Sequence, residues 1–468
     1  MSVFKKLRIL FSLIWRGVKG DHGDFTSGSI NHAIILLSVP MILEMGMESI
    51  FAVVDVYFVS RLNDNDALAA VGLTESVLSL IYSLAFGLSM GATALVARRV
   101  GEKDERGAED AAVQALFLGL FVTAVLTIAG LLYADDVLRF MGGSEELIAN
   151  NGSYARIMFG GNITIIMLFM INAVFRGAGD ASLAMKALLI GNGLNIILDP
   201  LLILGLGPIP AMGVKGAAIA TNIGRGVAVC FQLYHLIKGS SVVRLRLAHL
   251  RIKSAIILNM VKVSIGGIAQ MLIGSASWIF LMRLMSDFGS APLAGYFIAI
   301  RIIVFAILPA WGMANASATL VGQNLGAGMP DRAETSVWRA GFLNMVFLGL
   351  ITVVFFSMAE FILGFFSTDV EVLHHGVQCL KIVSLGYVFY AYGMVIGQSF
   401  NGAGDTRTPT IISLVGFWVF QIPLAYALSA YFHTGPVGVY VAISLAESLM
   451  AVASIYIFRK GNWKLVKV

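Results

Sequence analysis

Three carboxylates lie on one stripe of an otherwise apolar segment, residues 40–59, which reads PMILEMGMESIFAVVDVYFV. They are Glu44, Glu48 and Asp55. At about 100° per residue of helix, Glu48 lies about 40° and Asp55 about 20° around the axis from Glu44, so all three share one face. Such a face can bind a cation through its oxygens. It can also bind and release a proton, because two carboxylates in a low-dielectric cavity hinder each other's ionisation.

A second set of oxygen ligands is predicted in the segment NIILDP, residues 195–200. Asn195 and Asp199 are four residues apart and therefore lie on one side of a helix. Pro200 has no N–H and disfavours the helical conformation at Asp199, so we expect a kink or an opened turn, which exposes carbonyl oxygens to a cation. Oxygen ligands suit Na⁺, and H⁺ is equally compatible with these residues.

These acids are costly inside a membrane. Each costs about 2.5–3.5 kcal/mol at the bilayer midplane, so a functional role is favoured over a structural one. The structural alternative for the two aspartates is a buried hydrogen bond or ion pair. For Glu44 and Glu48 the alternatives are to line the mouth of a wet cavity or to pair with Arg301 or Lys262.

The composition indicates that these segments lie in a membrane. The chain has 468 residues, of which 58% are hydrophobic and 13% charged, and a large soluble protein carries more charge than this. Apolar runs of roughly 20 residues recur, as in membrane-spanning helices. We predict an all-α integral membrane protein with twelve transmembrane helices, near residues 33–60, 67–96, 110–133, 152–175, 183–205, 213–237, 255–285, 293–321, 335–357, 378–400, 409–431 and 436–458. The run 335–366 is compatible with one long helix or two short ones.

The chain also repeats itself. FRGAGD (175–180) and FNGAGD (400–405) are 225 residues apart, as are the similar segments that begin at residues 86 and 311. GVKGAAIA at 213 and GPVGVYVA at 435 follow at a slightly shorter offset. An even number of helices per repeat predicts two six-helix lobes related in parallel, with a cleft between them, an arrangement suited to alternating access. The predicted divisions are an N-terminal segment, an N-lobe, a basic linker, a C-lobe and a tail, at residues 1–30, 31–238, 239–254, 255–458 and 459–468.

Basic residues predict the orientation. They concentrate in the loops near residues 98–106 and 238–253 and in the C-terminal tail, which predicts that both termini and the even-numbered loops are cytoplasmic. This rule explains the net charge of +5, and nothing suggests a nucleic-acid partner. Residues 1–30 lack a signal-peptide cleavage pattern. They are compatible with an amphipathic segment on the inner membrane surface or with a disordered basic tail.

The two GAGD motifs and the cysteines have structural interpretations. Asp180 and Asp405 are expected to cap the helices that follow them, and the alternative is a cytoplasmic gating latch. Cys230 and Cys379 lie in apolar helices without metal-ligand spacing and are expected to be packing residues.

The chain resembles the MATE (multidrug and toxic compound extrusion) transporters over roughly residues 30–458. The resemblance rests on VVDVYFVSRL at 53–62, the FRGAGD and FNGAGD pair, NIILDPLLI at 195–203 and GAAIATNIG at 216–224. It implies twelve helices in two lobes and export of organic cations or amphipathic drugs in exchange for Na⁺ or H⁺, without a cofactor. It also implies a prokaryotic inner-membrane protein that contacts membrane lipids and works as a monomer.

The resemblance is to the DinF-like prokaryotic branch, which keeps its coupling acids in the N-lobe. The positions that match this branch are Asp55, Asn195, Asp199 and Thr221. The resemblance implies that they bind the coupling ion, with Na⁺ as a possible metal. Another branch has a glutamate where this chain has Gly274, so a C-lobe acid site is expected to be absent. Glu44 and Glu48 depart from the branch pattern.

We therefore expect a secondary active multidrug antiporter in which Pro40 and Gly46 let the first helix bend. Substrate or cavity contacts are expected from Glu44, Glu48, Tyr57, Gln270 and Arg301. The alternative is a lipid-linked oligosaccharide flippase of the same superfamily, which Arg225, Lys262 and Arg301 keep open. No HExxH or GxSxG motif suggests an enzyme, and no segment resembles a channel filter.

Overall fold

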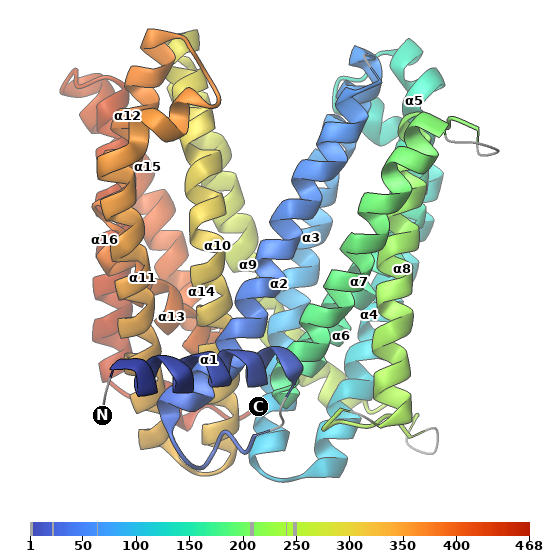
Figure 1. The fold of residues 1–468 in the computed structure, drawn as a ribbon, viewed down its shortest axis with the longest axis vertical. Helices are drawn as coiled ribbons and strands as arrows, with labels where there is room; N and C mark the ends of the chain where they lie inside the picture. Colours follow the sequence, from blue (N-terminus) through green and yellow to red (C-terminus); the bar gives the residue numbers. More distant parts are fainter. Residues whose placement is uncertain (1–2, 21–22, 63, 206–209, 240, 247–249) are drawn as a thin grey trace.

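The computed structural model describes residues 3–20, 23–62, 64–205, 210–239, 241–246 and 250–468, and every regular element among them is a helix (Figure 1). The side chains of some residues inside these ranges, that of Asp55 among them, lie outside the described part. An all-helical protein follows from long apolar runs, because a helix satisfies its own backbone hydrogen bonds in lipid.

Six helical spans form the N-lobe. They are α2 (Ile30–Ser60), α3 (Asn65–Gly101), α4 (Glu105–Phe140), α5 (Glu145–Gly160) with α6 (Asn162–Ala178), α7 (Ala181–Pro200) with η1 (Leu201–Gly205), and α8 (Val214–Lys238).

Six further spans form the C-lobe. They are α9 (Ser254–Ser286), α10 (Ser290–Gly326), α11 (Pro330–Gly364), α12 (Val370–Ser384) with α13 (Tyr387–Ala403), the run of α14 (Arg407–Leu414), η3 (Val415–Gln421), α15 (Ile422–Tyr426) and η4 (Ala427–Tyr431), and α16 (Pro436–Arg459). A short helix, η5 (Asn462–Leu465), follows.

The prediction of twelve helices in two lobes is confirmed. Ten of the described spans are long and apolar enough to cross a membrane, and the pair α12–α13, bent by 59°, is an eleventh. The twelfth is α8, which carries Lys215 and Arg225 and is therefore less apolar than the others. The run 335–366 belongs to one continuous helix, α11.

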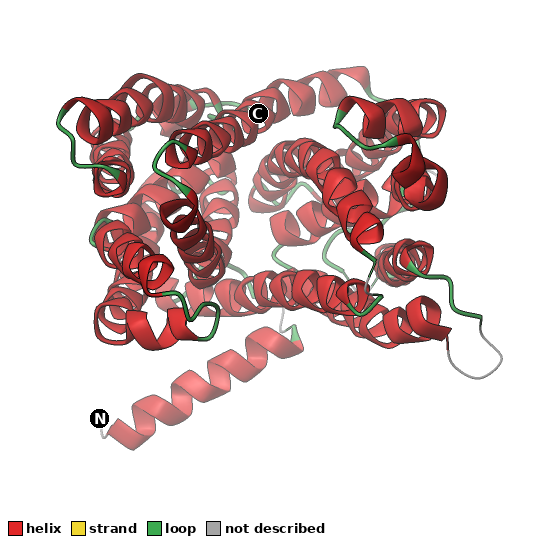
Figure 2. Ribbon diagram, turned by 90° about the horizontal axis from the view of Figure 1, so that it is seen from above, coloured by secondary structure: helices red, strands yellow, loops and turns green. Residues whose placement is uncertain are grey.

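The two lobes stand side by side, meet toward the end that holds both chain termini, and diverge toward the other end (Figure 1). We call the end with the termini the base. Residues 3–19 form a helix, α1 (Val3–Lys19), and not a disordered tail. This helix lies outside the bundle and packs across α2 (Figure 2). Gly17 permits the contact, because a Cβ there would lie 3.2 Å from the Leu36 carbonyl oxygen. That α1 lies on the inner membrane surface stays a prediction.

The backbone repeats in detail between the lobes. Gly179 and Gly404 end α6 and α13 with φ of 89° and 88°, and Gly213 and Gly435 precede α8 and α16 with φ/ψ of 57°/−142° and 61°/−144°. Glycine adopts these left-handed conformations without the steric cost of a side chain. The glycines therefore fix which residues of the two lobes are structurally equivalent.

The two motif aspartates differ in their contacts. Asp405 caps α14 as predicted, since Thr408 donates to it from its backbone N (3.2 Å) and its hydroxyl (2.6 Å). The capping prediction is wrong for Asp180, which makes no side-chain cap hydrogen bond to α7. Its Oδ2 accepts instead from Ser241 Oγ (2.6 Å) and Val242 N (2.7 Å). The linker between the lobes brings these donors to Asp180, so the motif anchors the linker.

The C-terminal tail joins the two lobes at the base. Arg98 of α3 donates to the Val466 carbonyl (2.8 Å) and more weakly to that of Ala403 (3.4 Å). Lys464 lies 2.5 Å from the Glu334 carboxylate, and this hydrogen bond raises the pKa of Lys464 above its usual value. The tail is thus held by the C-lobe and by Arg98 of the N-lobe.

A reciprocal set of contacts closes the base from the C-lobe side. Thr319 Oγ1 and Gln323 Nε2 of α10 donate to the carbonyls of Arg176 (3.0 Å) and Gly177 (2.9 Å) in the FRGAGD motif. Each lobe therefore uses its second span to hold the GAGD region of the other. These contacts form a latch at the base.

Close packing of α3 on α10 makes the latch sensitive to added volume. A Cβ on Gly326 would lie 2.1 Å from the Arg98 carbonyl oxygen. We expect Gly326→Ala to destabilise the closed base by about 1–3 kcal/mol, the usual cost of overpacking. Spin labels at positions 105 and 331, which are exposed at the base ends of α4 and α11, should report a longer distance in the variant.

The control for this prediction is Gly349→Ala. Nothing lies within 4 Å of a Cβ at Gly349, so the label distance should stay as in the unsubstituted protein. The labelling requires a background without Cys230 and Cys379, both of which are free thiols. An unchanged distance distribution in Gly326→Ala would show that the base does not depend on this contact.

Candidate functional site in the N-lobe and at the lobe junction

Polar side chains occupy the interior of the N-lobe at three levels along α2. The lowest level, nearest the base, is centred on Glu44. The middle level contains Glu48, and the upper level faces the segment Asn195–Asp199. We call them the lower, middle and upper clusters and describe them in turn.

The lower cluster is a buried ion pair. Arg176 Nη1 donates to Glu44 Oε1 at 3.0 Å, and the two side chains are 6% and 1% exposed. Asn172 Nδ2 donates to the same oxygen (3.2 Å), and Gln232 Nε2 donates to Asn172 Oδ1 (2.5 Å). The cluster thus links α2, α6 and α8 through charge-assisted hydrogen bonds, which are stronger than neutral ones.

The middle cluster is centred on Arg225 of α8. The Cζ atom of its guanidinium lies 5.5 Å from the centre of the Tyr82 ring, within the limit of about 6 Å for a cation–π contact. Glu48 of α2 and Glu75 of α3 both lie within electrostatic range of this guanidinium. Tyr154 Oη donates to Glu75 Oε1 at 3.4 Å. A cation of the chain itself therefore lies over an aromatic ring and near two carboxylates.

The upper cluster brings together three of the four predicted coupling-ion residues. Asn195 Nδ2 donates to Asp199 Oδ1 (3.2 Å) and to Thr221 Oγ1 (3.4 Å), and all three residues are buried. Asn195 Oδ1 is also buried and accepts no hydrogen bond from the residues that the structure describes. Oxygens of this kind fit a hard cation, so the residues present are compatible with Na⁺.

The backbone places Asp55 at the level of the upper cluster, although its side chain lies outside the described part. Asn192 Nδ2 donates to the Met47 carbonyl (3.0 Å), which sets α7 against α2. The two spans run in the same direction. Asp199 and Asp55 follow these contact residues by seven and eight positions, or about 10–12 Å of helix rise in each case.

The opened turn predicted after Asp199 is present. Helix α7 ends at Pro200 and continues as the π-helical segment η1, Leu201–Gly205. Proline removes one backbone donor and its ring crowds the preceding turn, so the helix widens. The C-lobe shows the same device, because π-helical segments lie on either side of Pro423.

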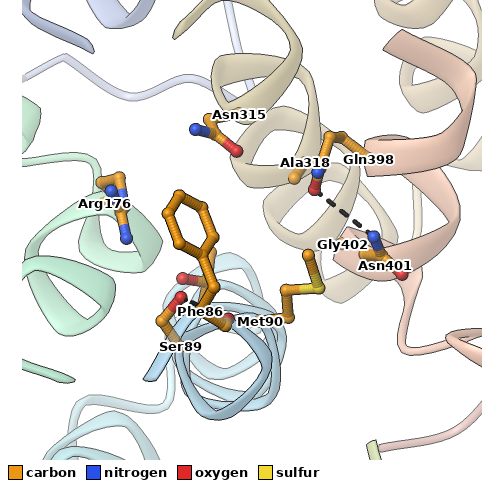
Figure 3. A pocket seen from close by; sticks show the side chains of 10 residues that line it. Phe86, Ser89, Met90, Arg176, Asn315, Ala318, Gln398, Asn401 and Gly402 are labelled. Atoms are coloured by element: carbon orange, nitrogen blue, oxygen red, sulfur yellow. Dashed lines mark hydrogen bonds between the residues drawn. The ribbon is translucent and has the colours of Figure 1, made fainter. Parts of the chain in front are cut away.

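A cavity lies where the two lobes meet, with about 390 Å³ of empty space including its open side. Figure 3 shows Arg176 of α6 on one side of this cavity and Gln398 and Asn401 of α13 on another, with Phe86 of α3 between them. Arg176 therefore belongs both to the lower cluster and to the wall of the junction cavity. Its position connects the interior of the N-lobe with the space between the lobes.

The other predicted cavity residues are distributed differently. Gln270 and Asn401 bond reciprocally through their side-chain amides (3.0 and 3.3 Å), so Gln270 fastens α9 to the FNGAGD motif. Tyr57 is half exposed and accepts from Arg61 at 2.6 Å near the end of α2. Arg301 is exposed, with its guanidinium 5.0 Å from the centre of the Phe297 ring. The structure does not bring these three residues together.

The partner alternatives for the two glutamates were also wrong. Glu44 pairs with Arg176, and Glu48 lies near Arg225, whereas Lys262 and Arg301 are exposed and make no ion pair with described residues. Sequence reasoning missed Arg176 as a site residue because it was read as part of a turn motif. The spacing of Asn172 and Arg176, four residues apart in an apolar segment, was the available signal.

Comparison with known proteins agrees with this architecture. A family model described as MatE matches residues 40–201 and, a second time, residues 266–427. The two matches begin 226 residues apart (266 − 40), within one residue of the offset of the internal repeat. Two six-helix lobes that meet around a polar junction cavity define a membrane transporter and not an enzyme. The chain belongs to the MatE family of transporters.

The relatives span the whole fold. The chain is 25% identical to the probable multidrug resistance proteins YoeA of Bacillus subtilis, over 92% of this chain and 94% of the relative, and NorM of Thermotoga maritima, over 93% of each. It is 24% identical to the multidrug export protein MepA of Staphylococcus aureus, over 92% and 94%. A solved outward-facing multidrug resistance MATE transporter is 28% identical, with a TM-score of 0.88 over 96% of this chain and 99% of that one.

Proposed function

We propose that this chain is a multidrug efflux transporter that exchanges organic cations or amphipathic drugs for H⁺ or Na⁺ by alternating access. The observation that carries the proposal is the upper cluster, where Asn195, Asp199 and Thr221 place oxygen ligands inside a membrane-spanning lobe. A buried carboxylate in a membrane is costly, and ion coupling gives it a use. The relatives named as multidrug export or resistance proteins support the substrate class.

The charge balance of the N-lobe interior supports a cationic substrate. Within the three clusters, the described carboxylates of Glu44, Glu48, Glu75 and Asp199 outnumber the guanidinium groups of Arg176 and Arg225, four to two. Each guanidinium also has a carboxylate beside it. A lipid-linked oligosaccharide flippase needs cationic groups for a pyrophosphate, and these two are already engaged. The interior therefore favours a cation over a pyrophosphate.

The coupling runs through α2 in this proposal. The ion is held by Asp55, Asn195, Asp199 and Thr221. Helix α2 also carries Glu44, whose partner Arg176 forms part of the junction cavity wall. If ion binding favours one shape of α2, it also changes the junction cavity, because Arg176 is bonded to Glu44 of α2. The ion site and the junction cavity then shift the same conformational equilibrium. The latch at the base opens in the opposite state of the cycle.

The setting we propose is the inner membrane of a prokaryote, with both termini cytoplasmic and the chain active as a monomer. In that orientation the lobes diverge toward the outside. Bacterial relatives and the basic loops at the base support this placement.

The test is transport in proteoliposomes. Vesicles that contain the full chain are loaded with a fluorescent organic cation, and its movement is followed under an imposed H⁺ gradient and then an imposed Na⁺ gradient. We expect saturable flux driven by one gradient and not by the other, which names the coupling ion. If no flux appears under either gradient, the proposal is overturned. A flux that does not saturate would indicate a channel.

A further inference from the structure

The C-lobe contains an interior cavity that the proposed coupling site does not use. It lies among α9, α10, α12, α13 and α16 and has about 360 Å³ of empty space including its open side. Aromatic rings of Trp278, Tyr387 and Tyr390 line it, together with the carboxylate of Glu447. The remaining lining is mostly aliphatic, with Ile303 among it.

Glu447 has no protein partner in this cavity. No hydrogen bond and no ion pair joins it to any residue in the described part of the chain. Glu447 lies near the middle of α16, a span of 24 residues. A lone carboxylate at this depth is costly to insert, so an intramembrane acid is a candidate binding residue, and aromatic rings beside it attract organic cations.

The internal repeat indicates which kind of ligand this cavity binds. Glu447 follows Gly435 by twelve positions, and Arg225 follows the equivalent Gly213 by twelve positions. The two side chains therefore occupy equivalent places in the two lobes. In the N-lobe, the guanidinium of Arg225 is the cation, held over the Tyr82 ring near two carboxylates. In the C-lobe, the equivalent position supplies a carboxylate instead.

No lysine, arginine or histidine is among the described residues that line the C-lobe cavity. The two matches to the family model are offset by 226 residues, which makes Gly274 of α9 equivalent to Glu48 of α2. The carboxylate of the C-lobe cavity is therefore supplied by α16 and not by α9. The expectation of no acid site in the C-lobe concerned the position of Gly274 alone, and Glu447 lies on a different helix. The equivalent position of α8 and α16 therefore carries opposite charges in the two lobes, an arginine in the N-lobe and a carboxylate in the C-lobe.

We propose that the C-lobe cavity is a second binding site, in which Glu447 and the rings of Trp278, Tyr387 and Tyr390 hold the guanidinium or alkylammonium head of an organic cation. With about 360 Å³ of empty space including its open side, the cavity has room for such a head group. The rest of the molecule extends toward the open side. The choice of an organic cation as the ligand rests on the proposed function, whereas the existence of the binding site does not rest on it.

The test is equilibrium binding without any gradient. Radiolabelled n-butylguanidinium, which imitates an arginine side chain, is titrated onto the purified full-length protein in detergent. We expect Glu447→Gln to weaken binding by at least about tenfold, as when one charge-assisted contact is lost. Glu360→Gln, which removes an exposed acid of α11 in the same lobe, should bind as the unsubstituted protein does.

A second variant keeps the test decisive if Glu447→Gln does not fold. Tyr390→Leu removes a ring and leaves the carboxylate, and it should weaken binding by about fivefold or more, in the range of a desolvated cation–π contact. Equal affinity in Glu447→Gln and the unsubstituted protein, or no binding by the latter, would overturn the inference. Failure of the proposed function is visible separately, as absent efflux in proteoliposomes.

Discussion

Asp199→Asn is expected to abolish gradient-driven efflux while the protein still folds. Asparagine has nearly the same shape and can accept the hydrogen bond from Asn195 that Asp199 Oδ1 accepts now (3.2 Å). It cannot carry the negative charge that binds a cation or a proton. A coupling free energy of about 1–3 kcal/mol changes the affinity of one site about 5–150-fold when the other site is occupied. Without this coupling, we expect the gradient-driven accumulation ratio of the substrate to fall to the value measured without a gradient.

The measurement compares initial efflux rates in proteoliposomes under the gradient that drives the unsubstituted protein. Asp287→Asn is the matched control, because Asp287 lies at the end of α9, exposed and paired with Arg283 (2.7 Å). Monodispersity in detergent checks folding for both variants. Efflux by Asp199→Asn at the rate of the control would exclude the upper cluster as the coupling site.

Glu44→Gln alone is expected to destabilise the protein strongly, and Arg176→Asn added to it should restore most of the stability. The single change leaves the buried Arg176 guanidinium without its counter-charge, and breaking such a pair costs about 3–5 kcal/mol. The double variant installs a pair that already exists in the other lobe. Gln270 and Asn401 occupy the equivalent positions there and bond through both amides.

We expect the double variant to lie within about 1 kcal/mol of the unsubstituted protein, since a neutral hydrogen bond then replaces the ion pair. Chemical unfolding in mixed micelles measures the free energies, and Arg176→Asn alone completes the cycle. Transport is the second readout, because the double variant also removes the Arg176 guanidinium from the junction cavity. Restored stability with lost efflux would separate the structural role of the pair from its role in coupling. Additive losses of stability in the double variant would contradict the prediction.

The sequence by itself determined the architecture. Apolar runs of membrane length occur twelve times, and the repeated FRGAGD and FNGAGD motifs divide them into two equal sets. The first signal is local, because a helix in lipid must satisfy its own backbone hydrogen bonds, and the second comes from comparing the sequence with itself. Asn195 and Asp199 were also predictable as a pair, since four residues of helix bring side chains to one face. The opened turn after Pro200 follows from the chemistry of proline at that position.

Only the tertiary structure decided which charges meet. Glu44 and Arg176 are 132 residues apart, and the sequence offered Arg301 and Lys262 as equally reasonable partners for the acid. The linker between the lobes, and not the helix that follows, supplies the donors to Asp180. The acid of the C-lobe cavity reaches it from α16, where no local pattern marks it. Periodicity fixes the face of a helix on which a side chain lies, whereas the packing of whole helices fixes what lies opposite, and that packing depends on contacts summed over the entire fold.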